Sequence, residues 1–104
     1  MATLYITEFV KQGRDGAGFP NQNATPEEPP MAEQTVAIGV TSVTSAAFNA
    51  KTTMVRLHCD AICSIAISTN PTATTTNRRL AANTTEYLAL PAGSGFKIAV
   101  IVNL

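Results

Sequence analysis

The sequence predicts a small all-β protein, and three observations lead to that prediction. Short runs rich in β-branched residues alternate apolar with polar positions, clusters of Gly, Pro, Asn and Thr interrupt them, and helical periodicity is hard to find. The 104 residues provide for one domain with one core. We therefore expect a single β domain over residues 1–104, folded as a small β-sandwich or a jelly-roll-like barrel.

The first predicted strand covers residues 1–10, with Leu4 and Ile6 on one face and Tyr5 and Phe9 on the other. The alternation then stops, and residues 11–33 are rich in Gly, Pro and Asn. A loop longer than about 12–15 residues inside a compact domain is usually functional or disordered. We interpret residues 11–33 as a long loop or extended arm, and two alternatives stay open: a flexible linker, and an arm that orders on a partner.

Residues 34–104 are expected to form the β-sandwich core. The last run, 96–102, places Phe96, Ile98, Val100 and Val102 on one face and leaves the other largely apolar, which predicts a central strand covered on both sides. Turns are expected at 70–77, at 83–84 and at 91–95. The remaining strands are expected at 34–40, 53–59, 62–68 and 86–90, with a looser stretch of small residues at 43–50.

The composition excludes several classes of partner. Charged residues make up 13% of the chain, against about 25% in an average protein, and the formal net charge is zero. Such a chain lacks the positive charge that binds nucleic acid or anionic membranes. No apolar run approaches the ~20 residues of a membrane span, and the amino terminus lacks a secretion signal, so we expect a protein made in the cytoplasm. The basic pair Arg78 and Arg79 is interpreted as a solvated or subunit-pairing feature.

The residue types needed for catalysis or metal binding do not converge in any recognisable pattern. His58 is the sole histidine, and on a strand it points away from its neighbour Cys59, whereas catalytic partners must meet at one point. A structural zinc site needs four ligands, and His58, Cys59 and Cys63 supply three. The acidic residues are scattered, without a spaced pair for acid–base chemistry. We therefore expect no enzyme activity, no metal and no cofactor.

If one continuous strand carries both Cys59 and Cys63, its rise of ~3.3 Å per residue places them about 13 Å apart, which is too far for a disulfide. A turn at Asp60 and Ala61 would bring them closer. We predict two buried free thiols that act as small hydrophobic side chains.

A resemblance is carried by the stretches Phe48–Ala50, Val55–His58, Ala61–Ala66, Asn70–Thr74, Glu86–Leu88, Pro91–Gly93 and Lys97–Ile101, which cover about the last half of the chain. They resemble the small virion proteins of tailed bacteriophages. Within that group the nearest role is the capsid decoration, or cement, protein, a small β domain on the outside of the head that clamps neighbouring major capsid subunits. The resemblance implies this role, and it transfers no catalytic residues.

The expected function is therefore that of a non-enzymatic decoration protein on the outer capsid surface, which binds the major capsid protein and forms a homodimer or homotrimer. Two alternatives remain: a tail, neck or fibre-attachment component of the virion, and a small carbohydrate-binding β domain. Only the last needs a pocket with convergent polar groups. Aromatic and Met side chains dominate interface centres, and the candidate partner contacts are Phe19, Pro20, Pro26, Pro29, Pro30, Met31, Arg78 and Arg79.

Overall fold

The computed structural model describes residues 2–11, 16–17 and 26–104, and in these residues the chain is all β without helices, as the sequence predicts. The strands in this part of the chain are β1 (Ala2–Phe9), β2 (Ala32–Ile38), β3 (Val43–Thr44), β4 (Met54–Cys59), β5 (Cys63–Ser68), β6 (Arg78–Leu80), β7 (Thr84–Ala89) and β8 (Lys97–Val102).

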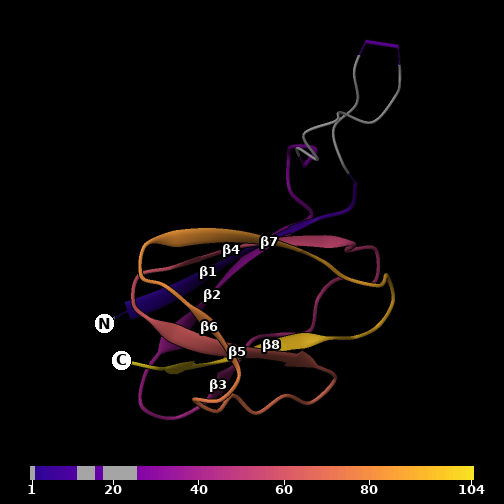
Figure 1. Cartoon of the computed structure of the whole chain (residues 1–104). Helices are drawn as coiled ribbons and strands as arrows, with labels where there is room; N and C mark the ends of the chain where they lie inside the picture. The colour runs from indigo at the N-terminus through magenta and orange to yellow at the C-terminus, as the bar shows by residue number, and fades with distance from the viewer. Residues whose placement is uncertain (1, 12–15, 18–25) are drawn as a thin grey trace.

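The strands form two antiparallel sheets that lie one above the other in Figure 1. Sheet 1 has the order β2-β1-β4-β7, and sheet 2 has the order β3-β8-β5-β6. Strand β2 contacts both β3 and β8. The β2 and β3 edges therefore lie on one side of the molecule, and β7 and β6 lie on the other.

The strand pairs are nested along the chain. β5 pairs with β6, β4 with β7, β3 with β8, and β2 with β1. The strands β2 to β5 thus form one half of an antiparallel ribbon, which turns back between β5 and β6. The other half runs through β6, β7 and β8, and β1 takes its last place, beside β2. Successive pairs of the ribbon alternate between sheet 1 and sheet 2.

The core lies between the two sheets. Leu4, Val55 and Leu57 of sheet 1 and Ile98 and Val100 of sheet 2 are fully buried. The alternation expected in the β4 region is confirmed, because Val55, Leu57 and Cys59 are buried while the residues between them are partly exposed. Full burial of one large aliphatic side chain stabilises the fold by about 1.5–3 kcal/mol. The buried side chains between the two sheets therefore supply most of the driving force for folding.

The strands differ from the sequence-based expectation in several places; β7, for example, begins at Thr84 instead of residue 86. β2 begins at Ala32 and ends at Ile38, so the last two residues of the 11–33 range lie in the strand. The stretch at 43–50 pairs regularly only at Val43 and Thr44, although Phe48 still reaches the core and its N–H donates to the Phe96 carbonyl at 2.9 Å. The short strand β6 was not expected, because Leu80 is its only buried residue and gives no alternating signal.

The turn before β8 is confirmed, with Gly93 and Gly95 at φ of 72° and 70°, a region that glycine enters without strain. The prediction of a central strand is also confirmed: β8 lies between β3 and β5, and Ile98, Ala99 and Val100 are fully buried.

The outer side of β8 is covered by the chain itself. The loop at 69–77 passes along the outside of sheet 2 (Figure 1) and buries Pro71 and Ala73. Thr44 Oγ1 donates to the Pro71 carbonyl at 3.4 Å, and the Ala73 N–H donates to Ser42 Oγ at 2.9 Å. The apolar second face of β8 is thus covered within one chain.

Candidate functional site

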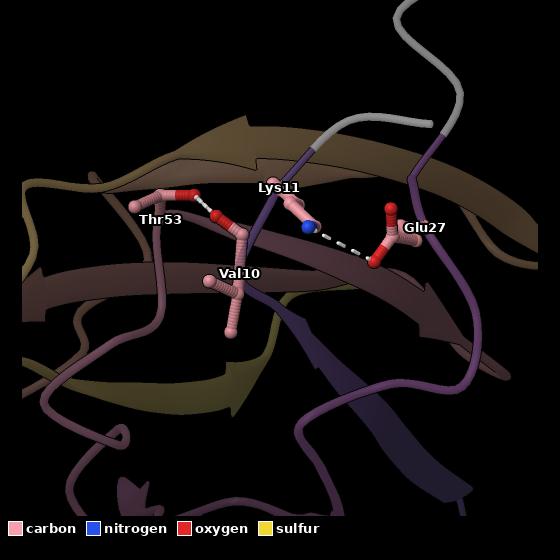
Figure 2. Close-up of polar contacts among 4 residues, drawn as sticks. All are labelled: Val10, Lys11, Glu27 and Thr53. Carbon is pink, nitrogen blue, oxygen red and sulfur yellow. Dashed lines mark hydrogen bonds and ion pairs between the residues drawn. The ribbon is translucent and has the colours of Figure 1, made fainter. Parts of the chain in front are cut away.

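Residues 10–11 and 26–31, the described residues at the two ends of the predicted arm, continue from β1 and lead into β2. The Met31 N–H donates to the Glu8 carbonyl at 2.7 Å, and the Glu27 N–H donates to the Lys11 carbonyl at 2.9 Å. Figure 2 shows that Lys11 Nζ also forms an ion pair with Glu27 Oε1 at 3.5 Å, and that Thr53 Oγ1 donates to the Val10 carbonyl. The segment that follows β1 and the segment that precedes β2 are therefore joined to each other and to the residues before β4.

Four of the candidate partner contacts lie in residues 26–31, which we call the arm base. Pro29 is exposed, Pro26 and Pro30 are partly buried, and Met31 is 39% exposed. Phe19 and Pro20 lie outside the described residues. The base thus presents an exposed apolar side chain and a proline-restricted backbone next to the edge strand β2.

A buried carboxylate connects the arm base to the neighbouring loop. Glu8 is 2% exposed and lies on the core side of β1, in the alternation that also places Leu4 and Ile6 inward. Its Oε1 accepts a hydrogen bond from the Asn49 N–H and another from Thr52 Oγ1, both at 2.8 Å. Because its backbone carbonyl accepts from Met31, one residue fixes both the arm and the loop at 49–52.

The adjacent arginines of β6 point to opposite faces of sheet 2. Arg78 pairs with Ile65 on the inner side and lines an open hollow with Ile65 and Ile67. Arg79 pairs with Ser64 on the outer side, and its Nε donates to the Asn103 carbonyl at 3.4 Å. β6 is the edge of sheet 2 opposite β3, whereas the arm base adjoins β2. The arginines and the arm therefore do not form one site.

The outer face of sheet 1 carries large side chains that the sequence reasoning did not single out. Tyr5 is 44% exposed and Tyr87 is 52% exposed. The rings of Tyr5 and His58 lie 6.4 Å apart between centroids, and His58 Nδ1 lies 3.0 Å from Thr85 Oγ1. Arg56 pairs with Tyr87 in the next row. Period-two alternation in the three strands concerned could have identified this face.

His58 and Cys59 point to opposite sides of β4, with Cys59 fully buried and its Sγ donating to the Ala81 carbonyl at 3.1 Å. Asp60 turns the chain into sheet 2, and this brings Cys63 beside Cys59 as a pair of free thiols. Burial, followed by the adjacent Cys59 thiol, raises the pKa of Cys63 to about 12. In the described ranges, no three His, Cys, Asp or Glu side chains are grouped so that they could hold a metal ion.

The comparisons with known proteins give no relative: no family model, no curated protein and no solved structure matches the chain. Among residues 2–11, 16–17 and 26–104, no helix is long and apolar enough to cross a membrane.

Proposed function

We propose that this chain is a non-enzymatic virion structural protein, a decoration protein that binds the major capsid protein on the outside of a tailed-phage head. The observation that carries the proposal is the arm base. A proline-rich segment with an exposed Met31 extends outward from a β domain and is held there by backbone hydrogen bonds to β1 and by the Lys11–Glu27 ion pair. An extended segment beyond the core is one means by which a β domain can contact a neighbouring subunit.

The fold proposed for this function is a β-sandwich of jelly-roll type. A jelly roll is an antiparallel ribbon wound over two four-stranded sheets. The nested pairs β5–β6, β4–β7, β3–β8 and β2–β1 support it, with β1 in the place of the eighth strand. In this arrangement the arm is the connection between two paired neighbouring strands, β1 and β2.

The backbone chemistry favours an arm that docks with a small loss of entropy. Pro26, Pro29 and Pro30 restrict the backbone before any partner arrives, which lowers the conformational cost of ordering. Met31 provides a polarisable apolar contact, while Glu27 and Glu28 are exposed at the rim, where charged side chains are tolerated.

The first test is the composition of purified virions, followed by imaging. We expect the protein in the particle, with its density on the head facets. Density on the tail or neck would replace the decoration role with the alternative virion role, and absence from the particle would overturn both.

The second test replaces residues 12–25 by a short Gly/Ser linker, which keeps the Lys11–Glu27 and Glu8–Met31 contacts. Cosedimentation with particles that lack the protein should fall for this variant and for Met31→Ser. The control is Val40→Ser, which removes a side chain that is 84% exposed in the turn between β2 and β3. Unchanged retention of both arm variants would show that the strands, not the arm, make the contact.

A carbohydrate-binding role has one observation in its favour, the exposed Tyr5 and Tyr87 rings on the outer face of sheet 1. Jelly-roll domains include lectins. Binding to a glycan array that is lost in both Tyr5→Ala and Tyr87→Ala would favour this role over the decoration role.

A further inference from the structure

The free edges of the two sheets differ in how well they are protected against pairing with another strand. In sheet 2, β3 has two residues and β6 has three, with Arg78 and Arg79 in it. In sheet 1, β2 follows Pro29 and Pro30, and the segment around Ala46 lies beside it. Gln34 Nε2 donates to the Ala46 carbonyl, and the Ala46 N–H donates to Gln34 Oε1. Short strands, charges, prolines and covering segments are the usual protections of a sheet edge.

Strand β7 has fewer of these protections, because its one charged residue is Glu86. It is six residues long, contains neither proline nor a basic residue, and in the described part of the chain pairs only with β4. Four of its residues, Thr85 to Tyr87 and Ala89, are exposed. Natural proteins rarely leave such an edge uncovered.

The hydrogen-bond pattern identifies which backbone groups are free. Leu90 bonds to Thr53 in the β4–β7 register, so Leu88, Glu86 and Thr84 are the residues that exchange bonds with β4. The N–H and C=O groups of Thr85, Tyr87 and Ala89 therefore point away from the sheet.

A second copy of β7 fits this edge in one antiparallel register. With Tyr87 opposite Tyr87 across a two-fold axis, Thr85 of each copy lies opposite Ala89 of the other, and the free groups form about six hydrogen bonds. Glu86 then lies opposite Leu88, so no two carboxylates face each other. On the outer face, the neighbouring pair Arg56 and Tyr87 joins its copy in a row of four, Arg–Tyr–Tyr–Arg.

We propose that the protein forms a two-fold dimer by antiparallel pairing of β7 with β7 of a second copy, centred on Tyr87, which joins two copies of sheet 1 into one continuous sheet. This inference specifies the homodimer or homotrimer expected from the sequence, and isolated protein tests it separately from the proposed binding to particles. The symmetric partner is favoured over a foreign strand because one register matches the free backbone groups, places Tyr87 beside Tyr87 and sets no like charges opposite each other.

The experiment is a charge exchange at the symmetry centre. Tyr87→Glu and Tyr87→Lys each place like charges opposite one another and should each weaken dimerisation about tenfold or more. An equimolar mixture of the two variants should restore the dimer, because unlike charges then face each other. Sedimentation equilibrium from micromolar to submillimolar protein measures all three samples.

Tyr5→Glu and Tyr5→Lys are the matched controls, since Tyr5 is similarly exposed on the same face but lies on the interior strand β1. They should leave the dimer intact. Circular dichroism and thermal unfolding of each variant separate loss of pairing from loss of fold. A wild-type monomer throughout the concentration range, dimers that persist in both Tyr87 variants, or dissociation caused by the Tyr5 variants would each overturn the proposal.

Discussion

The outer faces of the two sheets differ in what covers them. On sheet 2, the residues that point outward include Ser64, Ala66 and Ala99, and the loop at 69–77 lies over them. On sheet 1, the outward residues include Tyr5 and Tyr87, which stay exposed. Small side chains let a backbone approach closely, whereas large side chains keep it away. In this molecule, the sheet face with small side chains at the centre of its outward positions is the one that its own chain covers, whereas the face that carries Tyr5 and Tyr87 stays open.

The two sheets also hold their adjoining loops by different contacts. Sheet 1 fixes the loop at 49–52 through the buried carboxylate of Glu8. Sheet 2 holds its loop through neutral groups, among them Asn103 Nδ2, which donates to Ser64 Oγ at 2.8 Å and to the Thr75 carbonyl at 3.0 Å. Because hydrogen bonds to charged groups are the stronger kind, breaking the contact in sheet 1 should cost more.

The largest expected effect is therefore that of Glu8→Ala. It leaves the Asn49 N–H and the Thr52 hydroxyl without their acceptor and should lower the free energy of unfolding by about 2 to 4 kcal/mol. Urea unfolding followed by circular dichroism measures the change. Glu33→Ala, on the exposed side of β2 in the same sheet, is the control and should change stability by less than about 0.5 kcal/mol. Equal losses in the two variants would contradict the assigned role of Glu8.

An intermediate effect is expected when the covered face of sheet 2 is enlarged. Ala99 is fully buried on the outer side of β8, so Ala99→Leu must displace the loop and should cost about 1 to 3 kcal/mol. The same substitution at Ala37, exposed on the outer side of β2, should stay within about 0.5 kcal/mol. Hydrogen exchange should show loss of protection confined to residues 70–77 and their β3 contacts. If Ala37→Leu is as costly as Ala99→Leu, the contrast between the faces is wrong.

Period-two alternation in the sequence was sufficient to predict the all-β class and the strands that carry most of the core. It found β4, β5 and β8 because the sequence of each has apolar residues at every second position, such as Val55, Leu57 and Cys59 of β4. It was insufficient for β6, where three residues are too few to show a period, and for the cover of sheet 2, where Pro71 and Ala73 carry no periodic signal.

The features that define the candidate surfaces depend on strand order. Nothing in the residues of β7 alone shows that it is an edge, because that follows from its pairing with β4. Glu8, in contrast, could have been found: it continues the inward series of Leu4 and Ile6, and a carboxylate on that side requires hydrogen-bond donors. The Met31 and proline contacts of the arm remain predictions.

The smallest expected effect on stability is that of replacing Cys63. It is the first residue of β5 and lies near Cys59, the last residue of β4, where the chain passes from one sheet to the other. Burial and the Cys59 thiol raise the pKa of Cys63 from its ordinary value of 9.0 to about 12. The folded protein therefore holds this proton more tightly than the unfolded chain. The corresponding stability is fully present below pH 9.0 and is lost as the pH rises towards 12.

At neutral pH Cys63→Ala should thus differ from the wild type only by its packing, whereas above about pH 9 the wild type should lose stability more steeply than the variant. Urea unfolding of both proteins at a series of pH values gives the two slopes, and the other titrating groups cancel in their difference. Thiol titration of unfolded, non-reduced protein should find both cysteines, as the structure has them. Parallel slopes would mean that the Cys63 thiol ionises as easily in the folded protein as in the unfolded chain. No detectable thiol would mean a disulfide between the two sheets. Either result would contradict a pair of buried free thiols at this position.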